Sequence, residues 1–500
     1  MAIALGGLAL RLAPLLSGGG PLAFPVDYDE GVYFGASGLL ASGHLPYRDV
    51  IFVHPPMWLL LLLPFAGALQ AVVGADRAFA VAVLAMPFVG AVNVVLCGIV
   101  GRMIRGPVAG VLAAALYATY PAVVAVERGT FLEPSLNLFV LLGAMWWLRS
   151  DGSRRSQLAA GAAFGLAFAA KTWGAFAALA ALASLPVTTV LETRRAVLRL
   201  AIGAAGIIIV FVLPFLLLAP RDAAEQLVRF QLFRAPDGAA VADRVRIIFE
   251  PLWIRNRSQL IGSFHGVSAT GAGIGAICAL ARAWRRDGRA ERFLLVLAAT
   301  TIGAFLIGRT FWLQYLSHLV VAEVLLAGYA AGTAWTFFAR RPLRLVRPVL
   351  ALALAATPVI PFRQSMKSIP PRTHELHALA DLIARDVPPG ACLFAFEPAW
   401  GVASGRLPPA GFPPSADPYA SMLLPTSRPD LEFEGVGPAF EVPSSQVGMR
   451  RLLEHCDWVV YGGRGPAQLS AASEAWFQAA YERVAVVPGP AGLDLWHRIR

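Results

Sequence analysis

The sequence predicts an α-helical polytopic membrane protein with about eleven transmembrane helices, further juxtamembrane helices and a small C-terminal extracytoplasmic α/β domain. Apolar residues make up 57% of the chain, charged residues only 15%, and the mean hydropathy is +0.62. A soluble domain has roughly 45–50% apolar and about 25% charged residues. Apolar segments of membrane-spanning length recur as far as residue 361, and the chain becomes polar and proline-rich from about Arg363.

Eleven apolar segments are expected to cross the membrane, which requires about 20 residues per helix. The expected spans are 2–16, 78–101, 107–126, 131–148, 158–171, 173–191, 200–219, 259–281, 293–308, 316–338 and 346–361. The first is short, and a signal peptide is the alternative for it. Residues 57–73 are also apolar, and they could either cross the membrane or lie in its interface.

Arginine clusters recur after every second span. They are Arg102/Arg105, Arg149/Arg154/Arg155, Arg194/Arg195/Arg199, Arg282/Arg285/Arg286/Arg289/Arg292 and Arg340/Arg341/Arg344/Arg347. By the positive-inside rule these five loops are cytoplasmic. The N-terminus then lies inside and the C-terminal region outside, provided that residues 57–73 do not fully cross. The loop 220–258 also carries many arginines, but longer loops follow the rule less closely.

The polar C-terminal region is expected to form an α/β domain over residues 363–500, separate from a transmembrane domain over 1–362. Helical periodicity is seen at 374–385 and 473–483, and short apolar runs at 391–396, 458–461 and 484–487 indicate strands. About 135 residues are enough for a core of their own. Cys392 and Cys456 lie in this region; free buried thiols are the favoured interpretation, and a disulfide is the alternative.

The loop 17–56, between the first two apolar segments, is unusually polar. It contains Asp27-Tyr28-Asp29-Glu30, Leu45-Pro46-Tyr47-Arg48-Asp49 and His54-Pro55-Pro56. A carboxylate at a membrane surface can take the proton of an attacking hydroxyl or amine, so Asp29 is the expected base and Glu30 a catalytic neighbour. The alternative is that both only stabilise the first turn of a helix over 30–44. Tyr47, Arg48 and His54 are candidate substrate-binding residues.

Later outward turns supply further candidates. Glu133 is expected to be a second catalytic carboxylate, or else a helix-start residue. Lys171 could meet a phosphate as a point charge or extend to the lipid headgroups. The remaining candidate substrate-binding residues are Glu127, Arg128, Tyr315 and His318.

The net charge of +11 does not indicate nucleic-acid binding, because the basic residues cluster in short loops between apolar segments, where they orient the protein. We predict no nucleic-acid partner. We also predict no required cofactor and no metal site, although the carboxylates could take a divalent cation.

The polar loop resembles the first outer loop of the GT-C glycosyltransferases, in particular the protein O-mannosyltransferases and the lipid A aminoarabinose transferases. Asp29-Glu30 and His54-Pro55-Pro56 match the mannosyltransferase pattern. The aminoarabinose branch has Lys-Pro at the position of His54-Pro55, and Asp-Pro where this chain has Glu133-Pro134. Its glycine-rich span ending in lysine is similar to 161–171.

The resemblance implies an enzyme that takes a sugar, mannose or a related one, from a polyprenyl monophosphate carrier and transfers it to an extracytoplasmic protein, lipid or glycan. The expected mechanism is an inverting displacement with Asp29 as base. His54, Lys171 and loop arginines would neutralise the leaving phosphate. The expected location is the bacterial inner membrane. An O-antigen-ligase-like enzyme that uses a diphosphate carrier, a transporter or flippase of lipid-linked sugars, and a non-enzymatic assembly protein are the alternatives.

Overall fold

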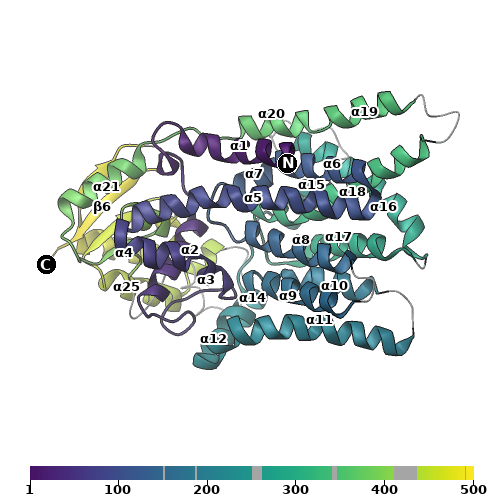
Figure 1. The fold of residues 1–500 in the computed structure, drawn as a ribbon. Helices are drawn as coiled ribbons and strands as arrows, with labels where there is room; N and C mark the ends of the chain where they lie inside the picture. Colours follow the sequence, from purple (N-terminus) through teal and green to yellow (C-terminus); the bar gives the residue numbers. More distant parts are fainter. Residues whose placement is uncertain are drawn as a thin grey trace.

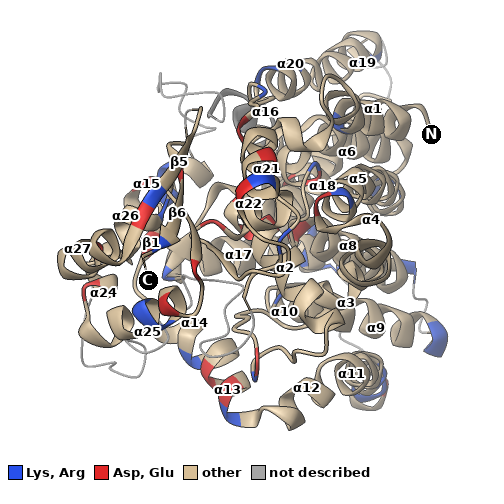
Figure 2. Ribbon diagram, turned by 90° about the vertical axis from the view of Figure 1, so that its left-hand side faces the viewer, with Lys and Arg blue, Asp and Glu red and all other residues tan. Residues whose placement is uncertain are grey.

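The computed structural model describes residues 1–149, 153–185, 189–249, 262–285, 287–339, 346–409, 436–489 and 491–499. Long, roughly parallel helices form a bundle, and a small sheet with its own helices covers one end of it (Figure 1). Charged residues are frequent on the loops, the sheet and the short helices at this end, whereas the bundle helices seen behind them are mostly uncharged (Figure 2).

The expected spans all correspond to helices where they are described. They are α1 (Ala2–Leu16), α5 (Ala75–Arg105), α6 (Pro107–Thr119), α7 (Pro121–Val126), α8 (Glu133–Arg149), α9 (Arg154–Ala170), α10 (Gly174–Ala183), α11 (Val190–Phe211), α12 (Leu213–Leu218), α16 (Gly262–Ala283), α17 (Arg289–Ile307), α18 (Leu316–Phe337), α19 (Arg347–Ala356) and α20 (Val359–Lys367). Helix α18 packs against α5, α6, α16 and α17 and is buried along most of its length.

Four helical segments are long and apolar enough to cross a membrane, among the residues that the structure describes. They are Ala75–Arg105, Arg289–Ile307, Leu313–Phe337 and Arg347–Lys367. Several other expected spans are shorter or broken by proline, as where Pro121 separates α6 from α7. The total of eleven spans therefore stays a prediction.

The arginine-rich helix ends lie together, away from the sheet (Figure 1). Arg105 at the end of α5 donates to Thr333 Oγ1 (3.1 Å), near the end of α18. Arg289 at the start of α17 donates to the carbonyl of Trp147 (2.7 Å), in the last turn of α8. These arginines bind the ends of neighbouring helices, so the predicted cytoplasmic loops share one face of the bundle.

The first loop folds at the end of the bundle that carries the sheet (Figure 1). A 3₁₀ turn (Pro21–Ala23) precedes α2 (Tyr28–Ala41), close to the helix expected over 30–44. The ambiguous apolar segment is a broken helix: α3 (Met57–Leu63), a π-helical turn (Pro64–Leu69) and α4 (Gln70–Val73). This broken helix packs against α2 and α5.

The loop between α12 and α16 is built from α13 (Pro220–Ala224), a π-helical turn (Glu225–Arg229), α14 (Phe230–Phe233), β1 (Asp237–Gly238) and α15 (Val241–Phe249). Strand β1 pairs in parallel with β2 (Thr310–Phe311), which follows α17. This pairing places the loop beside the 3₁₀ turn Leu313–Tyr315 that leads into α18.

The C-terminal sheet has the strand order β3-β4-β6-β5. Its strands are β3 (Leu393–Ala395), β4 (Trp458–Tyr461), β5 (Tyr481–Val487) and β6 (Leu493–Arg498); β3 and β4 are parallel, and the other pairs are antiparallel. Its helices include α21 (Glu375–Asp386), α22 (Pro398–Ala403), α24 (Val436–Phe440), α25 (Pro443–Glu454), α26 (Gly465–Gln468) and α27 (Ala471–Ala480). The expected strands at 391–396, 458–461 and 484–487 are confirmed.

Cys392 and Cys456 are joined by a disulfide, so the expectation of free thiols was wrong. The two cysteines precede the paired strands β3 and β4. The parallel pairing brings their Cα atoms to 4.8 Å, within the range that a disulfide bridges.

Helix α2 contacts the C-terminal region through a face without side chains. Gly31 packs on the backbone of Ala399 in α22, Gly35 on Pro408 and Gly38 on Leu407. Spacings of four and three residues place these glycines on one face. The two backbones therefore approach more closely than any larger residue would permit.

We expect Gly31→Ala to lower the free energy of unfolding by about 1–3 kcal/mol, because the added methyl group would overlap the backbone of Ala399. The measurement is an unfolding titration of the purified protein in detergent micelles. The control is Gly206→Ala in α11, where an added Cβ meets no atom within 4 Å. Equal stabilities of the two variants would contradict close packing at Gly31.

Candidate active site

A cavity of about 770 Å³, which we call the polar cavity, lies where the first loop, the α12–α16 loop and the C-terminal region meet. Its polar lining consists of Asp27, Tyr28, Asp29, Tyr33, His54, Lys171, Thr172, Trp173, Gln231, Arg234, Asp237, Thr300, Arg309, Thr310, Trp312, Gln314, Tyr315 and Arg464. Of the sequence-predicted residues, Asp29, His54, Lys171 and Tyr315 are brought together here.

Asp29 is positioned by the cap of α2. The Asp27 side chain accepts a hydrogen bond from the Asp29 N–H (3.0 Å). It also accepts the Glu30 N–H, and the Glu30 carboxylate in turn accepts the Asp27 N–H (3.0 Å), so these two residues form a capping box. Asp29 itself is half-buried, and its Oδ2 accepts a hydrogen bond from Gln314 Nε2 (3.2 Å). Glu30 thus stabilises the first turn of α2, as the capping interpretation expects. The Asp29 carboxylate takes no part in this cap and faces the polar cavity.

Glu30 also connects two loops. Its second oxygen accepts the N–H of Thr130 (2.9 Å), in the turn between α7 and α8. The side chain is buried, and this burial raises its pKa to about 8. Both carboxylate oxygens are held by backbone groups, so Glu30 fixes the position of Asp29 relative to the turn between α7 and α8.

Lys171 and Glu133 form a buried ion pair of 2.6 Å, with side chains 4% and 2% exposed. Lys171 ends α9, and Glu133 begins α8. The ammonium group lies over the rings of Trp173 (3.9 Å) and Tyr315 (4.2 Å), where cation–π attraction stabilises it. Glu133 lies behind Lys171 and does not line the polar cavity.

His54 lines the polar cavity and packs against the rings of Tyr33 and Phe52. Burial, and then the positive charges of Lys171 and Arg234, lower its pKa well below the usual value. The imidazole is therefore neutral and would donate a hydrogen bond to a phosphate rather than a charge. Tyr47 does not line the cavity; its hydroxyl donates to the His54 carbonyl (2.8 Å).

Three arginines that sequence reasoning did not single out also line the polar cavity: Arg234, Arg309 and Arg464. Arg234, which follows α14, pairs with Asp237 at 3.5 Å. Arg464, which follows β4, pairs with Glu397 at 3.4 Å. Arg234 belongs to a loop whose arginines were considered only as a group, and Arg464 lies more than 400 positions from Asp29, where no sequence pattern connects them.

Besides Glu30, Glu133 and Tyr47, four further predicted site residues lie outside the polar cavity. Arg48 forms an exposed pair with Asp49 (2.7 Å). Glu127 is fully buried among the helices, where it pairs with Arg11 (2.6 Å) and accepts hydrogen bonds from Asn93 and Tyr117.

His318 and Arg128 are the other two. The His318 Nδ1 lies 3.1 Å from Asn137 Oδ1, and Asn137 in turn donates to the Tyr117 hydroxyl (3.3 Å). His318 thus extends the buried network around Glu127. Arg128 donates to the carbonyl of Leu10 (2.9 Å).

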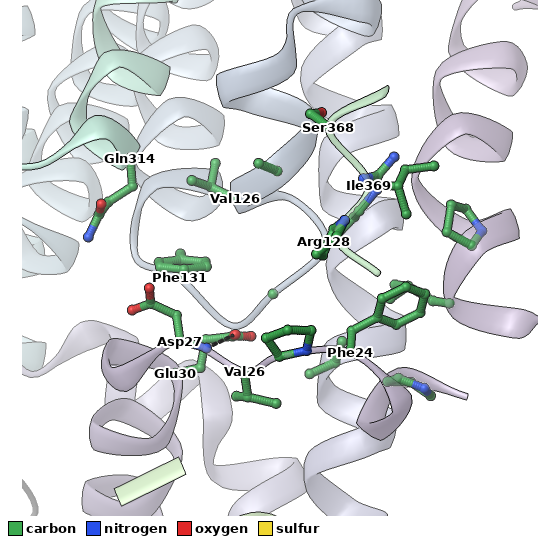
Figure 3. Close-up of a pocket in the computed structure, with 18 of the residues that line it drawn as sticks. Phe24, Val26, Asp27, Glu30, Val126, Arg128, Phe131, Gln314, Ser368 and Ile369 are labelled. Carbon is green, nitrogen blue, oxygen red and sulfur yellow. Dashed lines mark hydrogen bonds between the residues drawn. The ribbon is translucent and has the colours of Figure 1, made fainter. Parts of the chain in front are cut away.

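A second cavity of about 380 Å³, the apolar cavity, lies on the other side of the α2 cap. Arg128 and Gln314 stand on opposite sides of it, and Asp27 and Glu30 lie at one edge (Figure 3). Asp27 and Gln314 line both cavities. The first turn of α2 therefore separates a cation-lined space from an apolar one.

Within the described residues, no group of three or more His, Cys, Asp or Glu side chains is placed to hold a metal ion. Metal independence stays a prediction.

Solved structures resemble this chain over its whole length. ArnT from Cupriavidus metallidurans bound to undecaprenyl phosphate matches with a TM-score of 0.65 and 13% identity, over 100% of this chain and 97% of that chain. The apo oligosaccharyltransferase of Archaeoglobus fulgidus matches with a TM-score of 0.60 and 13% identity, over 100% and 74%. The chain therefore shares the overall fold of these structures. At such low identities, the likeness shows the fold alone.

A third similar structure is AglB from Archaeoglobus fulgidus in complex with an inhibitory peptide and a dolichol phosphate, with a TM-score of 0.58 and 13% identity over 93% of this chain and 69% of that chain. No protein-family model and no curated protein sequence matches the chain. The likeness is therefore one of three-dimensional arrangement.

We expect stability to decrease as pH rises from about 4.5 to about 8, in part because of Glu30. Its pKa is 4.5 in an ordinary environment and about 8 in the folded protein, so the folded state binds the proton more tightly and loses that advantage as pH rises. Glu30→Gln should flatten this dependence in thermal unfolding measured from pH 5 to pH 8.5. Asp381→Asn, at an exposed carboxylate of α21, should keep the wild-type slope; a wild-type slope in Glu30→Gln would contradict the assignment.

Glu133→Gln should lower the free energy of unfolding by about 3–5 kcal/mol, because it leaves the Lys171 ammonium buried without a counterion. Adding Lys171→Met should restore much of this loss. The measurement is an unfolding titration in detergent micelles. The control is Asp386→Asn, which breaks an exposed pair with Arg385 and should change stability little. If Glu133→Gln and Asp386→Asn cost the same, the ion pair is not the stabilising contact described.

Proposed function

We propose that this chain is an integral-membrane glycosyltransferase that moves a sugar from a polyprenyl monophosphate carrier to an acceptor hydroxyl or amine. One observation carries the proposal: the Asp29 carboxylate lines the same cavity as Lys171 and Arg234. A base and cations in one cavity are what displacement of a phosphate by a weak nucleophile requires.

The shape of the polar cavity suits a lipid-linked phosphate. Beside its charged part it has an apolar wall that includes Phe176 and Leu179 from α10 and Ala304 and Ile307 from α17. Leu179 and Ile307 are exposed at the surface of the bundle. A polyprenyl chain could lie along this wall with its phosphate toward Lys171, and burial of its apolar surface would stabilise the complex.

The reaction breaks the bond between the anomeric carbon and the phosphate oxygen of the donor. Asp29 takes the proton of the acceptor as its oxygen or nitrogen bonds to the opposite face of that carbon, which inverts its configuration. The electron pair of the broken bond leaves with the phosphate. Gln314, which donates to Asp29, and Glu30, through the cap, hold the carboxylate in place.

Charge on the leaving phosphate would be stabilised by Lys171 and Arg234, with a hydrogen bond from neutral His54. Lys171 is fixed by Glu133 and two aromatic rings, so it needs little reorganisation as charge develops on the phosphate. Tyr315 forms part of this enclosure. Glu133 thus acts on the reaction through Lys171 in our proposal, rather than as a base.

The reaction is proposed to take place at the extracytoplasmic face of a bacterial inner membrane. The arginine-rich helix ends lie at the opposite end of the bundle, which is the cytoplasmic end by the positive-inside rule. The disulfide between Cys392 and Cys456 fits an oxidising compartment on the side of the C-terminal domain, 363–500. We propose mannose or a related sugar as the group transferred, and a protein, lipid or glycan as the acceptor.

Asp29→Asn should reduce the rate of sugar transfer by a factor of about 10² to 10⁴, the typical contribution of a general base. The assay uses purified protein with radiolabelled polyprenyl-phosphate mannose, followed by release of the label from the lipid fraction. Asp222→Asn, at an exposed carboxylate of α13, should leave the rate unchanged.

Equal rates for wild type and Asp29→Asn would rule out Asp29 as the base. No transfer or hydrolysis by the wild-type protein with any monophosphate donor would favour a transporter or a diphosphate-dependent ligase. Transfer from a polyprenyl diphosphate sugar would then identify the ligase.

A further inference from the structure

The C-terminal sheet directs two charged residues toward the bundle. Glu397 follows β3, Arg464 follows β4, and these strands are parallel neighbours. Their carboxyl ends therefore lie at one edge of the sheet, where side chains from the two loops can meet. The Arg464 Nε lies 3.4 Å from a Glu397 oxygen, and Arg464 also lines the polar cavity.

The turn that carries Arg464 depends on glycine. Gly462 has φ +138° and Gly463 has φ +50°, conformations that other residues adopt with strain. A Cβ on Gly463 would also lie 2.7 Å from the ring of Trp400 and 3.1 Å from a Glu397 oxygen. The backbone thus approaches Glu397 closely, and this turn places Arg464 in the lining of the polar cavity.

The Arg464 guanidinium extends onto the residues around the proposed base. It lies over the ring of Tyr28 (4.3 Å), the neighbour of Asp29, and over Trp312 at 5.8 Å. Asp237 is within electrostatic reach of both Arg464 and Arg234. The two guanidinium groups therefore face the same part of the cavity, although one comes from the α12–α16 loop and the other from the C-terminal region.

Each of these cations has a carboxylate partner, but the pairs differ in length. Lys171 and Glu133 are 2.6 Å apart and almost fully buried. Arg234 and Asp237 are 3.5 Å apart, and Arg464 and Glu397 are 3.4 Å apart. A separation of 3.4–3.5 Å is long for a charge-assisted hydrogen bond, which is typically about 2.7–2.9 Å. The two arginine pairs are therefore the ones that an incoming phosphate can exchange.

We propose that Arg464 is a substrate-contacting residue, which exchanges its long pair with Glu397 for the phosphate of the lipid carrier and encloses that phosphate together with Arg234. This rests on the proposed function, because it assigns the phosphate of that donor to the polar cavity. A guanidinium carries N–H groups that can form paired hydrogen bonds with a phosphate, and the contact with the Tyr28 ring holds that of Arg464 beside the proposed base. The C-terminal region then completes the binding site.

The test measures binding of undecaprenyl phosphate and of uncharged undecaprenol to the purified full-length protein in detergent micelles, by ligand-dependent thermal stabilisation. Wild type should bind the phosphate more tightly than the alcohol. Arg464→Gln should weaken phosphate binding about tenfold, the loss of one hydrogen bond to a charged group, and should leave undecaprenol binding unchanged. In the transfer assay, the KM for the donor should rise while the KM for the acceptor stays constant.

A double variant separates this role from simple attachment of the C-terminal region. Arg464→Gln leaves Glu397 without its counterion, so it lowers stability in either case; adding Glu397→Gln removes that unpaired charge and should restore the melting temperature. If Arg464 contacts the phosphate, the double variant stays deficient in phosphate binding. If the double variant instead recovers phosphate binding together with its stability, the proposal is overturned.

The matched control is Arg483→Gln, on the exposed side of β5, where the arginine pairs with Asp494 at 3.6 Å and does not line the polar cavity. It should bind undecaprenyl phosphate like wild type. If Arg464→Gln binds undecaprenyl phosphate with wild-type affinity, the role proposed for Arg464 is refuted but the proposed function is not. Failure of the wild-type protein to prefer the phosphate over the alcohol would instead refute the proposed function.

Discussion

The carboxylate of Glu30 joins the parts of the chain on which the site depends. One oxygen caps α2, and the other binds the backbone of Thr130 in the turn between α7 and α8. A buried carboxylate is costly unless its oxygens are satisfied, so the two contacts constrain each other. Together they fix the first turn of α2, and with it the direction of Asp29. The polar and apolar cavities are separated by this same turn, so both owe their shape to it.

Charge pairing is the second constraint on this region. Lys171, Arg234 and Arg464 come from three distant segments, and each has a carboxylate within 4 Å. Unpaired cations in an enclosed space would weaken the fold, whereas a phosphate needs cations to bind. Pairs of unequal length reconcile the two requirements. The short pair holds the architecture, and the long pairs can be exchanged for a ligand, so the same residues contribute to stability and to the proposed binding.

The helices and most of the C-terminal strands could be predicted from the sequence, because apolar length and local periodicity determine them. Strand β6 was missed: its residues 493–498 mix apolar with charged side chains, and its pairing partners are distant. The site was predictable where residues are close in sequence, as for Asp29 and His54. Arg464 and Glu397 could not be found, because only the parallel pairing of β3 with β4 brings them together. Local sequence equally gave no sign that Glu127 and His318 belong to a buried network.

Through the glycine face of α2, the C-terminal region is in direct contact with the helix that carries the proposed base. Gly31 packs backbone against backbone on α22, with no side chain between them to absorb a displacement. A shift of α22 would therefore be passed directly to the turn that carries Asp29. This has a practical consequence for chimaeric proteins. A C-terminal region transplanted onto another scaffold of this fold would need to bring its own α2 with it, so the natural unit for exchange is discontinuous in sequence.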